Sequence, residues 1–502
     1  MTTKYIKKIL EAHVYDVAVE SPLEDALNLS KRLNNRVLMK REDLQSVFSF
    51  KCRGAFNRIY QLMKQKQVSG VIAASAGNHA QGVALAATKL GIDATIVMPK
   101  TTPEIKVKAV QARGGRTVLV GDAYDDAYQH AIKLSEEKNL EFIHPYDHPD
   151  TIAGQGTIGM EILRQHNDGI HAVFVPVGGG GLIAGVGAYI KYLRPETRII
   201  GVEPEDAPTL AEAMRKQRRV VLKQVGIFAD GVAVKQIGRE TFRVARQCVD
   251  DVICVTTDEI CAAIKDIFDD TRSIMEPAGA LAVAGMKKYV AQSQVRDEAL
   301  VVINSGANMN FDRLRHVSER AELGEQREAL IAATIPERPG SFRTFCKTIG
   351  KIGITEFNYR YSDDAEAKVF AGVKLVGGLE EKEQLIDKLT ASDYPVVDMT
   401  DNEMAKNHVR YMVGGRFPVE NEVLYRFEFP ERPGALLDFL TRIGKRWNIS
   451  LFHYRNHGAA YGRVLVGLQT PVEQRKQLVS YLDKLGYRYW EETDNPAYRL
   501  FL

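Results

Sequence analysis

The chain has 502 residues, of which 45% are hydrophobic and 26% are charged, and its formal net charge is +3. This composition predicts roughly two to four globular domains and gives no reason to expect a nucleic-acid or membrane partner. The scattered cysteines form no CxxC pair, and we find neither a signal peptide nor a run of about 18 apolar residues. We therefore expect a cytoplasmic protein without a disulfide framework or a metal site.

The first 311 residues predict strands that alternate with helices. Apolar, β-rich runs each precede a segment with the period of an amphipathic helix. The runs lie at 70–75, 94–99, 116–121, 172–177, 198–204 and 251–256. Strands that are apolar on both faces indicate a mostly parallel sheet covered by helices on both sides. Residues 1–311 are therefore predicted to form an α/β domain.

The composition changes after residue 311. Residues 312–328, DRLRHVSERAELGEQRE, are strongly charged and predict a helical linker. Beyond them the chain repeats itself, and each copy reads as a strand, a PERPG turn, a helix and a strand. A self-match through both a turn and an apolar pattern indicates a duplicated α+β module, which we place at 329–400 and 422–497.

The stretch SFKCRGAF, residues 49–56, contains Lys51 two residues before Arg53. A neighbouring cation and burial both lower the pKa of a lysine, and such a lysine can act as a nucleophile or a base. The alternative is a solvated lysine that opens a helix, and the octapeptide taken alone favours this alternative.

Four consecutive glycines, Gly178 to Gly181, lie between a predicted strand and a predicted helix in VPVGGGGLIAG. Without Cβ atoms the backbone N–H groups can form a concave nest, and the helix N-terminus favours an anion. Neither a Walker A lysine nor the GxGxxG spacing is present. The pattern predicts a phosphate site, with a flexible turn as the alternative.

Polar residues follow two other predicted strands. Ser75, Asn78 and His79 come directly after one strand in ASAGNHAQG, and Ser305 follows another in VVINSGANMN. Ligands in open α/β sheets bind at the carboxyl ends of strands, so these segments can share one crevice with the glycine loop. Each residue could instead be a helix cap or a turn residue. Together with Lys51 they suggest a phosphate-bearing cofactor that condenses with an amine.

The motifs SFKCRGA, SAGNHAQG, VPVGGGGLIAG, EPAGA and SGANMN, in this order, resemble the pyridoxal phosphate enzymes of fold type II, and specifically the threonine dehydratase (threonine ammonia-lyase) family. The duplicated module resembles the ACT-like regulatory domain of the biosynthetic form. The resemblance covers essentially the whole chain. It implies pyridoxal 5′-phosphate as the cofactor. It also implies a tryptophan synthase β-like catalytic domain with parallel sheets, followed by an α+β regulatory domain of two ACT-like repeats.

The resemblance implies roles for individual residues. Lys51 would form the Schiff base with the cofactor and then, once freed, take the substrate α-proton. Phe50 would pack near the ring, Asn78 would bind the ring 3′ oxygen, and Ser305 would face the pyridine nitrogen. The implied phosphate cup consists of Gly178, Gly179, Gly180, Gly181 and Leu182. The implied clamp for the substrate carboxylate consists of Ser75, Ala76, Gly77, Asn78 and His79.

Several residues keep two interpretations. Arg53 is assigned to structure in preference to catalysis, and any further role of His79 is undecided. Glu276 could lie near the cofactor or cap the helix that begins there. Cys52 stands where an aliphatic residue is commoner, so it could pack as a small hydrophobe or react with thiol reagents.

The implied reaction converts L-threonine, and also L-serine, to the ketoacid and ammonia, with 2-oxobutanoate as the product from threonine. Isoleucine is the implied inhibitor, valine the opposing ligand, and a homotetramer the implied assembly. The amides after Gly340 and Gly434, in the two PERPG turns, are candidate sites for an effector carboxylate. The alternatives are a serine dehydratase or serine racemase on the same scaffold and a non-catalytic amino-acid sensor. Ser305 and the double module favour the threonine enzyme, and the intact Lys51 argues against a sensor.

Overall fold

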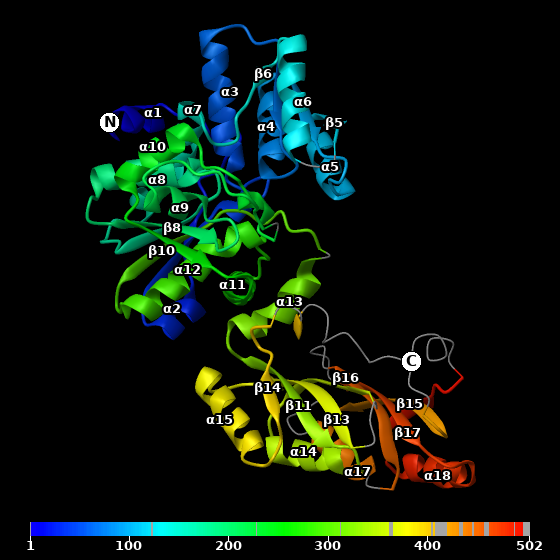
Figure 1. The fold of residues 1–502 in the computed structure, drawn as a ribbon. Coiled ribbons are helices and arrows are strands. Elements are labelled where there is room, and N and C mark those ends of the chain that lie inside the picture. Colours follow the sequence, from blue (N-terminus) through cyan, green and yellow to red (C-terminus); the bar gives the residue numbers. More distant parts are fainter. Residues whose placement is uncertain are drawn as a thin grey trace. The chain divides into compact units, whose positions relative to one another are not determined.

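The computed structural model divides the chain into two compact units, Met1–Gly324 and Glu325–Leu502 (Figure 1). No helix in the described part of the chain is long and apolar enough to cross a membrane. The described residues are 2–121, 124–226, 228–311, 313–360, 365–402, 405–406, 419–430, 435–443, 446–455, 461–485 and 487–494.

The first unit contains a six-stranded sheet in which only the edge strand β1 is antiparallel. Its strands, in spatial order, are β1 (Leu23–Asp25), β2 (Arg36–Arg41), β10 (Ala299–Asn304), β7 (Ala172–Pro176), β8 (Arg198–Pro204) and β9 (Asp251–Val255). Every residue of β7 is buried. This burial explains why the sequence shows an uninterrupted apolar run there.

Helices cover both faces of this sheet, because the side chains of each strand alternate between two cores. In β7, Val173 and Val175 join one core, and Ala172 and Phe174 join the other. The first core includes residues of α1 (Thr2–Leu10), α7 (Pro149–Gln165), α8 (Gly181–Leu193), α9 (Thr209–Arg215) and α10 (Arg239–Cys248). The second includes residues of α2 (Leu27–Leu33), α11 (Thr257–Thr271), α12 (Pro277–Ser293) and α13 (Arg313–Gly324).

The first unit also contains a second, smaller sheet of four parallel strands. In spatial order they are β5 (Arg116–Leu119), β4 (Asp93–Met98), β3 (Gly70–Ala74) and β6 (Glu141–Phe142). Residues of α3 (Lys51–Gln65), α4 (Asn78–Leu90) and α5 (Glu104–Gln111) share one core with it, and α6 (Tyr124–Glu137) contributes to another (Figure 1). The predicted α/β strands are therefore present, but they form two sheets.

The charged segment 312–328 contains α13, which belongs to the first unit. Val317 and Ala321 are buried in the core shared with α11 and α12, and Arg320 pairs with Asp258. The boundary expected after residue 311 thus precedes this helix, and the division between the units follows Gly324. The sequence prediction missed this packing because the segment is mostly charged and contributes only two apolar residues to this core, Val317 and Ala321, one helical turn apart.

The second unit confirms the predicted duplication, because a β-α-β-β-α-β order occurs twice. The first copy consists of β11 (Glu328–Pro336), α14 (Ser341–Ile349), β12 (Ile354–Arg360), β13 (Glu366–Lys374), α15 (Gly378–Thr390) and β14 (Val396–Asp398). The second consists of β15 (Glu422–Pro430), α17 (Ala435–Ile443), β16 (Asn448–Arg455), β17 (Tyr461–Gln469), α18 (Arg475–Leu485) and β18 (Arg488–Glu491).

Both copies contribute to one eight-stranded sheet, because β12 and β16 pair antiparallel at its centre. Phe357 and Phe452, which occupy equivalent positions in the two repeats, lie in one core with ring centroids 5.6 Å apart. In the first PERPG turn the amide of Ser341, next after Gly340, donates to Arg338 O at 3.2 Å. That amide is therefore already paired, contrary to our expectation, and Gly434 lies outside the described residues.

Candidate active site

Lys51 is the first residue of α3, and its backbone is tightly enclosed. The amide of Phe50 donates to Ser305 O at 3.2 Å. A Cβ at Gly82 of α4 would lie 3.1 Å from the carbonyl carbon of Lys51, so the two helices touch at this point. Lys51 Nζ lies 3.4 Å from Pro145 O and 5.1 Å from the centroid of the Phe50 ring. The amine is thus directed into the protein.

Burial lowers the pKa of Lys51 to about 8, against the opposing charge of Glu276. A pKa of about 8 leaves about a tenth of the amine neutral at pH 7, whereas an ordinary lysine is almost wholly protonated. The predicted direction of the shift is correct. Its causes are burial and the charge of Glu276, and the charge of Arg53 is not among them.

Asn78 opens α4 at the end of β3, and both ends of its amide are held. Its Nδ2 donates to Glu276 Oε1 at 2.6 Å, and its Oδ1 accepts from Asn308 Nδ2 at 2.6 Å. Just before it, the amide of Gly77 donates to Ser75 Oγ at 3.3 Å, which closes the tight turn around Ala76. One hydrogen of Asn78 Nδ2 is left for a further acceptor.

Glu276 precedes α12, but its side chain makes no capping hydrogen bond. The carboxylate instead accepts from Asn78, which places Glu276 at the site. Burial raises the pKa of Glu276 to about 7, and the charge of Asp230 adds to the effect. Of the two interpretations left open by the sequence, a helix cap is not observed, and the carboxylate instead lies beside Asn78 of the predicted site.

His79 is buried, and its Nε2 lies 2.8 Å from Ile143 O. A carbonyl can only accept, so Nε2 carries the proton. Burial, followed by the charge of Lys51, lowers the pKa of His79 to about 3, and the ring is therefore neutral. The imidazole holds the start of α4 to the chain after β6 and leaves only the backbone of His79 for the predicted clamp.

The glycine loop connects β7 to α8. Gly180 has φ of 87°, which is unfavourable for residues with a Cβ. A Cβ at Gly179 would lie 2.2 Å from the ring of Tyr146, and one at Gly181 would lie 3.0 Å from Tyr146 Cβ. No sequence motif points to Tyr146, although its ring packs against the loop.

The loop amides fit the predicted phosphate. The carbonyl of Gly178 accepts from Thr209 Oγ1 at 3.1 Å, and that of Gly179 accepts from Thr241 Oγ1 at 2.7 Å. The N–H groups from Gly178 to Leu182 find no hydrogen-bond acceptor among the described residues, although residues 179–182 are buried. Buried N–H groups normally have partners, so a bound anion would satisfy this nest.

Ser305 follows β10 directly and is 4% exposed. Its Oγ lies 3.4 Å from Ala278 O, which is a long contact for a hydroxyl group. The hydroxyl is therefore only weakly engaged by the protein. The hydroxyl group of Ser305 is therefore available to hydrogen-bond a ligand bound in the site.

The predicted segments lie close together, but they come from two sheets. Asn78 follows β3 of the small sheet, whereas the glycine loop and Ser305 follow β7 and β10 of the large sheet. A Cβ at Gly231 would lie 3.6 Å from Glu276 Oε1 and 4.0 Å from Asn78 Nδ2, and the next residue, Val232, contacts Gly178. The site thus lies where the carboxyl ends of strands from both sheets meet.

Cys52 is completely buried with Val14, Ala18 and Val47. Burial raises the pKa of its thiol to about 12. A buried, protonated thiol reacts poorly, so Cys52 packs as a small hydrophobe.

Two family models match the chain. The model described as pyridoxal-phosphate dependent enzyme matches residues 15–306, and the one described as C-terminal regulatory domain of threonine dehydratase matches 319–409 and 413–502. The Burkholderia multivorans protein named L-threonine dehydratase biosynthetic IlvA is 55% identical over 502 residues, which cover 99% of both chains.

Solved structures show a similarity that covers nearly two thirds of the chain. The processed form of threonine deaminase isoform 2 from Solanum lycopersicum is 51% identical, with a TM-score of 0.63 over 64% of this chain and 93% of that chain. Maize serine racemase is 32% identical, with a TM-score of 0.58 over 62% of this chain and 95% of that chain. With the full-length relative and both family models, these matches confirm the predicted fold type II and the cofactor class. The chain belongs to the biosynthetic threonine dehydratase family of pyridoxal-phosphate-dependent enzymes.

Proposed function

We propose that the protein converts L-threonine to 2-oxobutanoate and ammonia, as the first step of isoleucine biosynthesis. The single observation that carries this proposal is a partly buried lysine, Lys51, with a pKa of about 8, together with a nest of backbone amides that find no acceptor among the described residues. The names of its full-length relatives support the choice of substrate.

The bound cofactor supplies an electron sink for the carbanion at the substrate α-carbon. Lys51 would hold the cofactor through its amine, and the freed amine would take the substrate α-proton. The lowered pKa suits both roles, because each requires the neutral amine. The N–H groups from Gly178 to Leu182 bind the phosphate, and Phe50 borders the ring.

Asn78 would donate its remaining Nδ2 hydrogen to the ring oxygen, because Glu276 and Asn308 occupy its other contacts. Ser305 would face the ring nitrogen with a hydroxyl group, which cannot force ring protonation as a carboxylate would. A hydroxyl group in that position would favour elimination over transamination. The turn from Ser75 to His79 receives the substrate carboxylate through backbone groups at the start of α4.

We propose that the second unit binds isoleucine as the inhibitor and valine as the opposing ligand, within a homotetramer in the cytoplasm. The match of residues 319–502 to a regulatory-domain model supports this division of roles. Each effector must bind one quaternary state more tightly than another, and the shift in activity is limited by that difference. The catalytic part would comprise residues 1–311 extended by α13, and the regulatory repeats would lie at 329–400 and 422–497.

Steady-state kinetics on L-threonine and L-serine, with and without isoleucine, test the proposal. The expected result is a higher kcat/KM for threonine, 2-oxobutanoate as the product, and inhibition by isoleucine that valine relieves. The likeness to serine racemase makes serine chemistry the second candidate. Faster turnover of L-serine, or formation of D-serine, would support that candidate, and a protein without a visible cofactor band would be a sensor.

A further inference from the structure

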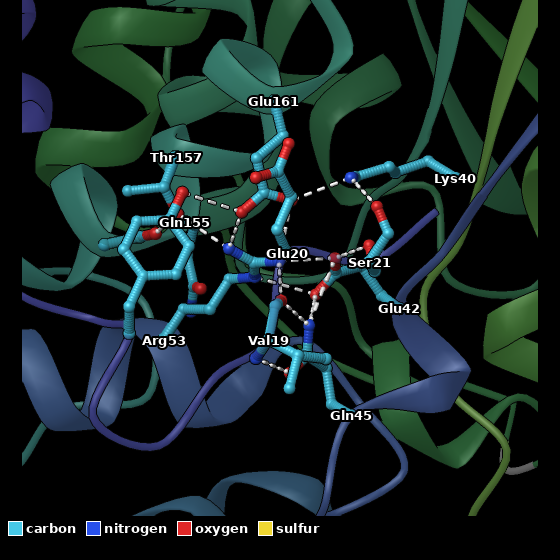
Figure 2. Close-up of polar contacts among 12 residues, drawn as sticks. Val19, Glu20, Ser21, Lys40, Glu42, Gln45, Arg53, Gln155, Thr157 and Glu161 are labelled. Carbon is cyan, nitrogen blue, oxygen red and sulfur yellow. Dashed lines mark hydrogen bonds and ion pairs between the residues drawn. The ribbon is translucent and has the colours of Figure 1, made fainter. Parts of the chain in front are cut away.

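Four buried charged residues form a network of ion pairs (Figure 2). One of them, Arg53, lies two residues after Lys51 in the sequence. We call it the Arg53 network; it consists of Arg53, Glu42, Glu161 and Lys40, and each of these side chains is 0% exposed. Its two positive and two negative charges balance. Neither the proposed chemistry nor the family match assigns these residues a role.

Arg53 is bound on both sides by carboxylates. Its Nε and Nη2 each donate to an oxygen of Glu42 at 2.8 Å. Its Nη1 and Nη2 donate to the oxygens of Glu161 at 2.5 and 3.0 Å. Thr157 Oγ1 and Val19 O accept the remaining contacts at 3.1 Å each. Every nitrogen of the guanidinium donates a hydrogen bond, and carboxylates bind two of its edges, so the orientation of its plane is fixed.

The charges depend on one another. Burial acts to raise the pKa of Glu42, but the charge and hydrogen bonds of Arg53 outweigh burial and hold this pKa below its usual value. Burial lowers the pKa of Lys40, whose Nζ lies 2.7 Å from Glu161 Oε2. Removing one partner therefore leaves an uncompensated charge inside the protein.

The network joins three segments, and the one that contains Glu161 is distant from the other two in the sequence. Arg53 belongs to the first turn of α3, and Glu161 belongs to α7. Lys40 is the last residue but one of β2, and Glu42 begins the 3-10 turn η1 (Glu42–Leu44) that follows this strand. The carboxyl end of a strand in the large sheet is thus tied to the helix that carries Lys51.

Close packing of α3 on α7 reinforces this connection. A Cβ at Gly54 would lie 2.4 Å from Gln155 Nε2, and one at Gly154 would lie 2.7 Å from Arg53 O. The amide of Gly54 donates to Gln155 Oε1 at 3.2 Å. The backbone on both sides of Arg53 is therefore held against α7, and the first turn of α3 has little freedom to rotate.

We propose that Arg53 is a positioning residue for Lys51: the Arg53 network fixes the first turn of α3 and thereby the direction of the Lys51 amine. This inference rests on the proposed role of Lys51. A lysine side chain at position 53 keeps the charge but loses the planar fork. A displacement of about 1 Å at a reacting group can cost roughly a hundredfold in rate.

The test uses the holoenzyme of Arg53→Lys. We expect kcat to fall at least tenfold, while the KM for L-threonine stays within about twofold because the clamp lies on α4. We also expect the visible band of the bound cofactor to titrate at a different pH from the wild type, since this band reports the environment of the Lys51 amine without any substrate. If Arg53→Lys yields no soluble holoenzyme, Glu161→Gln decides by the same measurements.

The matched control is Asp266→Asn on α11. Asp266 is a largely buried carboxylate that pairs with Arg32 and Lys287, both at 2.6 Å, and it belongs to neither the site nor the Arg53 network. Both variants should lower Tm, but only the Arg53 variant should change kcat and the titration of the band. If the two variants differ from the wild type only in Tm, the Arg53 network has a purely structural role and the inference is wrong. A wild-type protein without a cofactor band would overturn the proposed function instead.

Discussion

Replacing Gly179 by alanine tests the phosphate nest by steric means alone. The new Cβ would lie 2.2 Å from carbon atoms of the Tyr146 ring, whereas carbon atoms normally approach to about 3.5 Å. The ring or the loop must therefore retreat by more than about 1 Å. Gly179 does not have a positive φ, so the change adds no backbone strain.

The shift should weaken cofactor binding as well as folding. Overpacking of this kind costs about 1–3 kcal/mol of folding free energy. If the displaced loop loses one charge-assisted hydrogen bond to the phosphate, binding weakens by about 1.5–3 kcal/mol. At 1.4 kcal/mol per tenfold, the dissociation constant of pyridoxal phosphate should rise roughly 10- to 150-fold.

Titration of the apoprotein with pyridoxal phosphate, followed by the visible band, measures this constant. Gly169→Ala is the control, because this exposed glycine precedes β7 and a Cβ added there would meet nothing within 4 Å. The control should bind the cofactor as the wild type does. Equal affinities for Gly179→Ala and Gly169→Ala would show that the loop does not hold the phosphate.

Lys51→Ala should lower kcat by several orders of magnitude, since base and covalent roles are each worth roughly a hundredfold or more; near-normal turnover would mean that another lysine acts. The rate of cofactor capture by the apoprotein should rise about tenfold per pH unit below about 8 and level off above it, because burial lowers the pKa of Lys51. A stopped-flow profile that keeps rising to an ordinary lysine pKa near 10.4 would contradict this. Ser305→Asp should increase pyridoxamine phosphate relative to ketoacid in product analysis, and an unchanged ratio would remove Ser305 from the ring nitrogen. A chain ending at Gly324 should remain active and lose its response to isoleucine, and inhibition at an unchanged concentration would place the effector site in the first unit.

Local patterns in the sequence predicted the parts of the site that lie at strand ends. Each of these parts follows a strand whose residues are nearly all apolar, so one short stretch of sequence contains both the strand and the site residues. The parts are Gly178–Gly181, Ser305 and the turn before Asn78. Lys51 was identifiable only from its motif, because the octapeptide around it favours a solvated lysine. The burial that lowers its pKa comes from segments distant in the sequence.

Features that depend on distant contacts could not be predicted from the sequence. The strand β2 ends with Lys40 and Arg41, which are both buried although the apolar pattern of the sequence does not indicate this. Lys40 is tolerated there because Glu161 of α7 neutralises it. Tyr146 reaches the site from a loop without a motif of its own, and the division into two sheets depends on which strands pair.

The most direct test of the central claim is to identify the residue that carries the cofactor. Borohydride reduction of the holoenzyme makes the link between lysine and cofactor permanent, and peptide mass spectrometry locates it. We predict that the phosphopyridoxyl group is found on Lys51, in the peptide that contains SFKCRGAF. A modified lysine elsewhere in the chain, or no modification in an active enzyme, would contradict the account.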